Sequence, residues 1–407
     1  MSKTKLIAAL DIGSSAIKIL IAGKKEGEDK LHVVYQAQEP SVGVRRGTVM
    51  EPEKTSTAIQ VLLNKVKTEG GHKVRSVYIN IGGTHLFCTV SKGNIIVSRA
   101  DEKISKEDVE RVLQSAEIFS LPSNKEILEV FPKEYIVDGQ GGIKDVVGMK
   151  GVRLETEVLA LGVFSPYKNN LTDSVLDTGL QILDVIPSPL SSAAAVLSQR
   201  QKELGVALLE IGAGATQLAV FEEGNLIHLA ILPIGSANIT NDIAIGLKTD
   251  TDTAELIKTE LGCCIFKGKN KKEKIEIEDE EPLVFSQKML SKIIEDRVSE
   301  IFEEVKKELK KISKQGLLPA GVVLTGGGAK LSKIVDLAKK ELKLPCRLGR
   351  PAKFTNLDDE LSFTTACGLI LRGVDWEEDK DLGRIKISSV SGGFGQKLKK
   401  FFQTFIP

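Results

Sequence analysis

The sequence predicts an α/β protein built from two related lobes, each opened by a β-hairpin. Residues 10–14 read LDIGS and residues 209–213 read LEIGA. Each segment ends an apolar strand at a carboxylate, and a turn of small residues and a second apolar strand follow. The offset of the two carboxylates, 210 − 11 = 199 residues, is about half of the 407-residue chain. A chain of this length exceeds one typical core, so we expect a duplicated fold whose lobes face one cleft.

The first lobe is predicted to alternate strands and helices. Residues 6–10 and 16–21 form the two strands of the first hairpin. Apolar residues at helical spacing predict a helix over 55–66, and residues 74–81 predict a strand. This alternation indicates α/β layers.

An α+β subdomain is predicted to interrupt the first lobe over residues 84–164. A helix opens near Ile104 and runs through Ala116, with Ser105 as its N-cap and Asp108 three residues later. The strands on either side of this helix make the insertion a compact unit of its own.

The second half ends in a long amphipathic helix, a short strand and a glycine-rich turn. The helix is predicted over 291–312, the strand over 321–324, and a further helix begins near Leu331. Residues 267–281 change from lysine-rich to acidic, which favours a solvated surface loop. Residues 375–393 are polar and contain Gly and Ser, so they predict a linker.

Composition excludes several classes of function. The formal net charge is +1 and aromatic residues are only 5% of the chain, which argues against nucleic-acid binding. Five cysteines without a C-x-x-C pair argue against a disulfide framework. Four well-separated histidines make a metal site on His or Cys side chains improbable. Without the apolar stretch of a signal peptide or of a membrane span, the chain is expected to remain in the cytoplasm.

The turns after the two predicted hairpin strands have the composition of phosphate-binding loops. Small residues let backbone N–H groups approach phosphate oxygens closely. Ser14 and Ser15 add hydroxyl donors, and Asp11 stands where it could hold Mg²⁺ through water. Residues 212–216 would grip the phosphates from the opposite lobe. Residues 326–328 leave room for a base or ribose before a helix whose N–H groups face it. Taken singly, each pattern is more often only a tight turn.

Together and in this order, the three turns resemble the phosphate 1, phosphate 2 and adenosine motifs of the actin-like ATPases. Within that superfamily the closer resemblance is to the FtsA family, and it covers nearly the whole chain. It is carried by the segments 40–48, 131–155, 239–247 and 318–328. The resemblance implies an actin-like (ribonuclease H-like, duplicated) two-lobed ATPase fold whose usual outer subdomain is replaced by one inserted elsewhere. It also implies head-to-tail filaments and binding of the C-terminal peptide of the tubulin-like FtsZ.

Six segments follow from this resemblance. They are a first lobe core (1–83 and 165–200), the inserted subdomain (84–164), a second lobe core (201–240 and 313–374), a small subdomain (241–312), a linker (375–393) and a C-terminal amphipathic helix (394–407).

Matching residues to the motifs assigns a nucleotide site for ATP and Mg²⁺. Its residues are Asp11, Ser14, Ser15, Lys18, Gly212, Ala213, Gly214, Thr216, Gly326, Gly327 and Gly328, with Asp11 and Glu210 as the catalytic carboxylates. Glu255 and Lys258 resemble the helix that flanks the ribose and base in this superfamily. An ordinary i, i+3 surface pair explains them equally well.

The second phosphate motif departs from the family pattern. FtsA proteins typically read DIGGGTTD there, whereas residues 210–217 read EIGAGATQ. In addition, Ser188 stands where the family usually has Glu. Hydrolysis needs an oriented water and a group that accepts its proton or positions it. We therefore expect binding of ATP and Mg²⁺ with slow or absent turnover.

The last segment has the pattern of a membrane-binding helix. Its apolar face is formed by Phe394, Leu398, Phe401, Phe402, Phe405 and Ile406, and Lys397, Lys399 and Lys400 lie off that face. Such a helix can bury its apolar side in an anionic membrane surface. A single tail binds weakly, and a filament of many tails binds by avidity. The alternative is a helix that docks on the body of the protein or on a partner.

The predicted function is a membrane anchor for FtsZ at the division site, on the cytoplasmic face of the membrane, that also recruits later division proteins. Lys292 and Arg297 on the predicted 291–312 helix are the candidate contacts for FtsZ, and a solvated helix face is the alternative for each of them. Two other functions on the same fold are a PilM-like adaptor of a type IV pilus machine and a sugar or acid kinase. A kinase leaves the C-terminal segment without a role.

Overall fold

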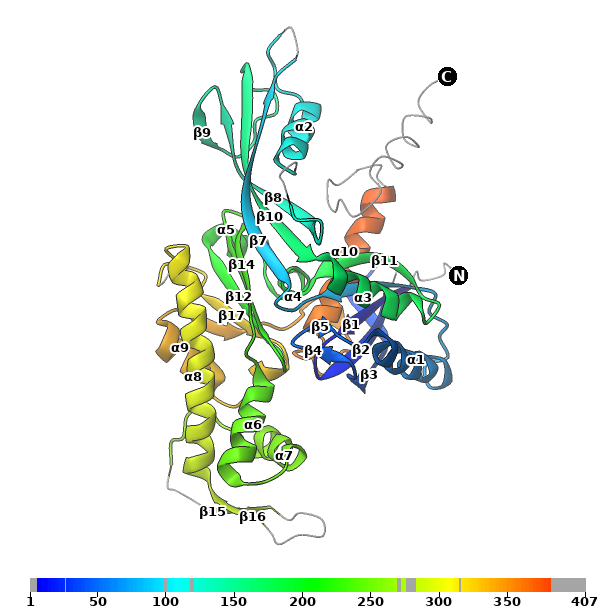
Figure 1. Cartoon of the computed structure of the whole chain (residues 1–407), viewed down its shortest axis with the longest axis vertical. Helices are drawn as coiled ribbons and strands as arrows, with labels where there is room; N and C mark the ends of the chain where they lie inside the picture. Colours follow the sequence, from blue (N-terminus) through cyan, green and yellow to red (C-terminus); the bar gives the residue numbers. More distant parts are fainter. Residues whose placement is uncertain are drawn as a thin grey trace.

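A computed structural model describes residues 6–25, 27–98, 101–117, 121–268, 272–275, 283–314 and 316–381. It has two lobes, each built on a mixed sheet, and a subdomain that projects from the first (Figure 1). The linker from residue 382 onward and the predicted membrane helix 394–407 lie outside the described residues.

The first lobe is a six-stranded sheet in the order β11-β6-β1-β2-β3-β19. Its strands are β1 (Leu6–Ile12), β2 (Ala16–Lys24), β3 (Leu31–Pro40), β6 (Ser76–Ile81), β11 (Gln181–Pro187) and β19 (Phe354–Thr355). Around them lie the small β4–β5 hairpin (Val44–Arg45 and Thr48–Val49) and the helices α1 (Pro52–Thr68), α3 (Ser165–Leu176) and α4 (Ser188–Val196). Helix α5 (Gln199–Leu204) follows α4 and packs against strand β13 of the second lobe.

The second lobe carries a five-stranded sheet in the order β14-β13-β12-β17-β18. Its strands are β12 (Val206–Ile211), β13 (Thr216–Glu222), β14 (Asn225–Leu232), β17 (Val322–Thr325) and β18 (Cys346–Leu348). Its other elements are α6 (Ser236–Leu247), α7 (Thr251–Leu261), β15 (Lys272–Ile275), β16 (Leu283–Ser286), α8 (Gln287–Lys311), the short 3₁₀ helix η1 (Gly327–Lys330) and α9 (Ile334–Leu342).

The two sheets repeat one topology, which confirms the predicted duplication. The first-lobe order β3-β2-β1-β6-β11 matches β14-β13-β12-β17-β18 strand for strand. In both lobes the first three strands form an antiparallel meander. The fourth strand then pairs in parallel with the strand that carries the carboxylate. The ends of β1 and β12 therefore occupy equivalent places in the two lobes.

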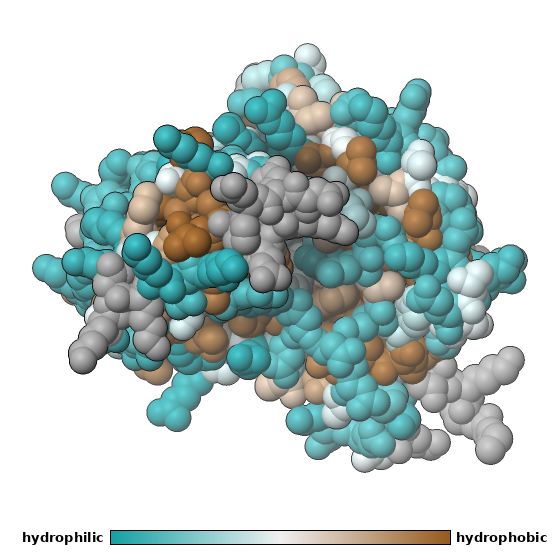
Figure 2. Space-filling view, turned by 90° about the horizontal axis from the view of Figure 1, so that it is seen from below, coloured by the Kyte–Doolittle hydropathy of each residue, from teal (hydrophilic) through white to brown (hydrophobic). Residues whose placement is uncertain are grey.

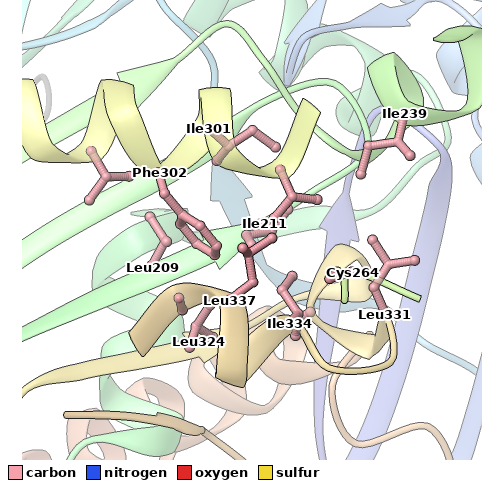
Figure 3. Packing of buried hydrophobic residues seen from close by; sticks show 14 of the residues in the cluster. Leu209, Ile211, Ile239, Cys264, Ile301, Phe302, Leu324, Leu331, Ile334 and Leu337 are labelled. Atoms are coloured by element: carbon pink, nitrogen blue, oxygen red, sulfur yellow. The ribbon is translucent and has the colours of Figure 1, made fainter. Parts of the chain in front are cut away.

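The second-lobe core forms where α8 and α9 cover the sheet (Figure 3). Phe302 of α8 is fully buried and lies among residues of β12 and α9, such as Leu209 and Leu337. The buried positions of α8 recur at helical spacing from Leu290 to Leu309, which is why this sequence forms one long amphipathic helix. Burying an aromatic side chain of this size is worth roughly 1.5–3 kcal/mol.

The inserted subdomain is an antiparallel sheet covered by one helix. Its elements are β7 (Leu86–Ile96), α2 (Lys106–Glu117), β8 (Lys125–Val137), β9 (Gln140–Ile143) and β10 (Arg153–Phe164), and its strand order is β7-β10-β8-β9. The predicted cap is confirmed: the Ser105 backbone N donates to Asp108 Oδ2 at 3.0 Å, and the Asp108 N donates to Ser105 Oγ at 3.3 Å. The base of the subdomain also contacts the second lobe, because Leu159 and Leu161 of β10 share a core with Leu229 of β14.

The last described helix, α10 (Thr364–Asp381), packs against α4 and β1 of the first lobe. The linker predicted from residue 375 is wrong at its start, because the helix continues to Asp381. Residues 374–381 contain neither Gly nor Pro, so nothing in the sequence ends the helix earlier. Similarly, part of the surface loop predicted over 267–281 is strand β15, which pairs antiparallel with β16.

Other predicted boundaries move by a few residues. The first-lobe helix begins at Pro52, where a proline suits the first helical turn. The helix expected from Leu331 begins at Ile334, after the 3₁₀ turn η1. The helix expected from residue 291 starts at Gln287, because the Ser286 side chain caps it by accepting a hydrogen bond from the Met289 backbone N.

Candidate functional site at the lobe junction

The turns that follow β1 and β12 meet at the junction between the lobes. A Cβ atom added to Gly214 would lie only 2.7 Å from Ser14 Oγ, so the two turns are in direct contact. The third turn joins them from the side of β17, since a Cβ on Gly326 would lie 2.6 Å from the carbonyl oxygen of Ile211. Gly326 also has φ +85°, which glycine adopts without strain. The three predicted loops thus converge, and both contacts require glycine.

Asp11 is a buried carboxylate held from two sides. Its Oδ2 lies 3.3 Å from Lys18 Nζ, which stands opposite it on β2. Its Oδ1 accepts a hydrogen bond from Asn80 Nδ2 at 2.7 Å. Asn80 Oδ1 in turn accepts from the Ile12 backbone N at 2.7 Å, and its Nδ2 also donates to Ser188 Oγ at 3.0 Å. Asn80 therefore fixes the position of the carboxylate.

Glu210 is the equivalent carboxylate of β12, but its surroundings differ. Its Oε2 accepts a hydrogen bond from Ser192 Oγ of α4 at 2.8 Å, and its Oε1 accepts one from Thr365 Oγ1 of α10 at 2.6 Å. Burial raises the pKa of Glu210 to about 7, and the negative charge of Asp11 adds to the increase, although both hydroxyl hydrogen bonds oppose it. Glu210, whose side chain is one methylene longer than that of aspartate, thus links the second-lobe sheet to α4 and α10 through these two hydrogen bonds.

Two positions that depart from the family pattern lie side by side near Gly82. A Cβ on Gly82 would be 3.0 Å from Ser188 Oγ and 3.6 Å from Gln217 Nε2. Ser188 Oγ donates to the carbonyl of Ile81 at 3.2 Å. Gln217 Oε1 is buried and has no hydrogen-bond partner among the described residues. A hydroxyl and an amide therefore occupy this corner, and neither takes up a proton near neutral pH.

Glu255 and Lys258 form an i, i+3 ion pair on α7, with Nζ 2.6 Å from Glu255 Oε2. The lysine is nevertheless buried, so this is not an ordinary surface pair. Its Nζ also donates to Thr240 Oγ1 at 2.8 Å and to the carbonyl of Ser236 at 3.3 Å. These contacts tie α7 to the first turn of α6, which starts next to the second phosphate loop: the Ser236 backbone N donates to the carbonyl of Gly212 at 2.8 Å.

Lys292 and Arg297 lie far from the junction, on α8. Arg297 makes a two-point ion pair with Asp242 of α6, at 2.5 Å from Nε and 2.9 Å from Nη2. Lys292 is exposed and pairs with Asp296 at 2.7 Å. A pocket of about 320 Å³ lies between α6 and α8. Its lining residues are Asp242, Ile245, Gly246, Ile293, Asp296, Arg297 and Glu300.

The end of the molecule that carries this pocket also exposes apolar side chains. Figure 2 views the molecule from the α6–α7 end and shows a largely hydrophilic surface broken by hydrophobic patches. Ile245 of α6 is 77% exposed, and Leu256, Val284 and Met289 are also exposed in this subdomain. The pocket itself combines the apolar side chains of Ile245 and Ile293 with one guanidinium and three carboxylates.

Several residues at the junction were not assigned to the site from the sequence. Asn80, Ser192 and Thr365 hold the two carboxylates, and Gly47 donates its backbone N–H to Ser14 Oγ at 2.7 Å. A polar residue next to the end of an otherwise apolar strand was the one available signal for Asn80. Among the described residues no group of three or more His, Cys, Asp or Glu side chains could hold a metal ion. No described helix is long and apolar enough to cross a bilayer.

Solved structures with the same arrangement define the class of this protein. The PilM–PilN type IV pilus biogenesis complex aligns with a TM-score of 0.65 at 17% identity, covering 90% of this chain and 98% of that one. MreB5 of Spiroplasma citri bound to ADP aligns with a TM-score of 0.57 at 12% identity, covering 93% and 99%. A family model described as an SHS2 domain inserted in FTSA matches residues 83–161. The protein is therefore actin-like in fold and carries an inserted SHS2 domain.

Sequence comparison then gives the family. The model of cell division protein FtsA matches residues 207–368. The FtsA of Pseudomonas aeruginosa is 35% identical over 381 residues, covering 92% of this chain and 91% of that protein. The FtsA of Bacillus subtilis is 34% identical, covering 91% and 84%. This chain belongs to the FtsA family of cell division proteins.

Proposed function

We propose that this chain is an ATP-binding, filament-forming membrane anchor. It tethers FtsZ filaments to the cytoplasmic face of the membrane at the division site and recruits later division proteins. The observation that carries nucleotide binding is the contact between the Ser14 and Gly214 turns, one from each lobe. The division role is supported by FtsA relatives that are 30–35% identical over most of the chain. The PilM complex is only 17% identical, so a pilus adaptor is less well supported.

The residues at the junction fit a phosphate chain. The contacting turns have glycine at the closest approach, which leaves their backbone N–H groups accessible to phosphate oxygens. Asp11 is fixed by Asn80 and is placed to hold Mg²⁺ through water, while Lys18 supplies a positive charge beside it. Bound ATP with Mg²⁺ would supply a triphosphate that contacts the turns of both lobes and so links them.

Turnover is expected to be slow because proton acceptors are scarce around the phosphates. Ser188 and Gln217 offer a hydroxyl and an amide, and Glu210 is held toward α4 and α10 by the hydroxyl groups of Ser192 and Thr365. In a single-turnover assay with radiolabelled ATP, phosphate release should be far below the roughly 1 s⁻¹ at the low end of typical kinases. Phosphate release at ordinary ATPase rates that Asp11→Ala abolishes would refute this expectation.

The pocket between α6 and α8 is the proposed binding site for the FtsZ C-terminal peptide. Ile245 and Ile293 provide its apolar surface, and Arg297 provides guanidinium N–H donors held in place by Asp242 and Glu300. The segment 394–407 is proposed to bind the membrane through its phenylalanines and lysines. The pocket would thus bind FtsZ, and the segment 394–407 would bind the membrane.

A recruitment assay tests the tether as a whole. A fluorescent FtsZ tail peptide should float with anionic liposomes when full-length protein is present, and should not float with a chain ending at Gly393. Arg297→Ala should lower peptide recruitment at least about tenfold and leave binding of the protein to liposomes unchanged. Lys311→Ala is the matched control, since Lys311 lies at the far end of α8 in an exposed pair with Glu308. Equal flotation of peptide with the truncated chain would remove the anchor proposal.

A further inference from the structure

The β4–β5 hairpin reaches the point where the two phosphate turns meet. The backbone N of Gly47 donates a hydrogen bond to Ser14 Oγ at 2.7 Å. A Cβ atom on Gly214 would lie 3.1 Å from the Cα of Arg46 as well as 2.7 Å from Ser14 Oγ. The tip of this hairpin, residues 46–47, therefore contacts both lobes at the predicted phosphate site (β4, β5, β1 and β2 lie together in Figure 1).

The hairpin tip is a two-residue turn formed by Arg46 and Gly47. Arg46 has φ 49°, in the left-handed region that long side chains rarely occupy. Gly47 follows with φ 74°, and a Cβ there would lie 2.8 Å from the backbone N of Gly83. The next residue, Thr48, is buried and its Oγ1 lies 2.9 Å from His85 Nδ1. Positive φ at both residues is common in a two-residue hairpin loop, and the contacts of Gly47 and Thr48 fix where this loop lies.

Charge at the tip is available for a ligand. The Arg46 side chain is exposed, and none of the described residues forms a hydrogen bond or ion pair with it. Lys18, which also lies at the junction, is already paired with Asp11. A guanidinium offers five donors in a planar fork that matches phosphate oxygens.

The Gly47–Ser14 hydrogen bond directs the serine hydroxyl. A hydroxyl has one proton and two acceptor lone pairs. Because Gly47 N–H uses one acceptor lone pair of Ser14 Oγ, the serine proton remains free to be donated to a phosphate oxygen. The backbone of the hairpin thus positions Ser14 as a donor, next to the backbone of Arg46.

We propose that the β4–β5 hairpin is a further nucleotide-binding element, in which the Arg46 guanidinium binds the terminal phosphate of a nucleoside triphosphate and Gly47 positions Ser14. The inference rests on the proposed nucleotide binding. It adds a specificity: the diphosphate lacks the group that Arg46 contacts, so Arg46 makes the protein prefer ATP to ADP.

Isothermal titration of the full chain with ATP and with ADP, in the presence of Mg²⁺, tests the proposal. Arg46→Gly removes the guanidinium and suits the positive φ, so the hairpin backbone is kept. The Kd for ATP should rise roughly 10- to 100-fold, the value of a charge-assisted hydrogen bond, while the Kd for ADP changes less than about threefold. Arg46→Lys keeps the charge and should recover part of the ATP preference.

Arg45→Ala is the matched control, because Arg45 has the same charge and lies one residue away, within strand β4 where it pairs with Thr48. It should leave the ratio of the two Kd values unchanged. An equal change for ATP and ADP in Arg46→Gly, or the same loss of preference in Arg45→Ala, overturns the assignment to Arg46. If the unaltered protein binds neither nucleotide, the proposed nucleotide binding itself fails; if it binds ATP and Arg46→Gly keeps the preference, only this inference fails.

Discussion

Replacing Gly368 by alanine is expected to destabilise the protein by about 3 kcal/mol or more, or to prevent folding. Gly368 lies where α10 crosses α4, and a Cβ atom there would be 1.8 Å from the carbonyl oxygen of Ser191 and 2.3 Å from its carbonyl carbon. Both atoms belong to the backbone, so rotation of a side chain cannot relieve the overlap. The Ser191 hydroxyl also links the two helices at this point, because it donates a hydrogen bond to the carbonyl of Thr365 at 3.0 Å.

Urea unfolding of the two proteins, followed by circular dichroism, measures this loss. Gly246→Ala is the matched control, because Gly246 is also a helical glycine and its added Cβ would meet Ile293 Cδ1 at 2.6 Å. That atom is the end of a flexible side chain and can move, and alanine gains up to about 1 kcal/mol of helix propensity over glycine. We expect Gly246→Ala to be near neutral. A Gly368→Ala protein as stable as the original would show that α10 and α4 are not packed as described.

The sequence predicted the duplicated architecture because its signals are local. Each hairpin is a contiguous run of apolar residues broken by a small-residue turn, and the repeat of the LDIGS pattern as LEIGA exposed the second copy. The Ser105–Asp108 cap of α2 was likewise readable, since its two residues are three positions apart. The order of the strands in each sheet was not predicted and comes from the structure.

Contacts between distant segments could not be predicted from the sequence. Asn80 and Ser188 are 108 residues apart, and only the pairing of β6 with β11 brings them together. The burial of Lys258 depends on how α7 packs against α6, so the spacing of Glu255 and Lys258 alone suggested an exposed pair as well. The contact of Gly47 with Ser14 arises from a hairpin whose sequence carries no phosphate-binding pattern.

The role that the sequence motif assigns to Glu210 differs from the role that its contacts in the structure indicate. By its place in the motif it is a catalytic carboxylate. In the folded chain it accepts hydrogen bonds from helices α4 and α10, which pack against each other between the two sheets. A carboxylate that is desolvated in this way favours its protonated form. The stability of the contact between the lobes therefore depends on whether the Glu210 carboxyl is protonated.

The free energy of unfolding should consequently fall as pH rises from about 4.5 through about 7, by up to about 3 kcal/mol from this residue. Burial raises the pKa of Glu210 to about 7 from the model-peptide value of 4.5, so the folded state binds a proton that the unfolded chain has lost. An increase of the pKa from 4.5 to about 7 corresponds to about 3 kcal/mol. This stabilisation is complete below pH 4.5 and is lost once the folded carboxyl ionises.

Glu210→Gln removes the ionisation and keeps a hydrogen-bonding side chain of the same size. Its amide oxygen can accept from one hydroxyl, and the hydroxyl of Thr365 or Ser192 can turn to accept from its NH₂ group. The variant should match the original protein near pH 5 and become more stable than it by up to about 3 kcal/mol at pH 8. Other titrating groups, such as the half-buried His85 and Glu129, are present in both proteins and cancel in the difference. A difference in stability that stays constant from pH 5 to 8 would mean that Glu210 is ionised throughout this range. The contact between the lobes would then contain a buried negative charge that accepts hydrogen bonds from the hydroxyl groups of Ser192 and Thr365.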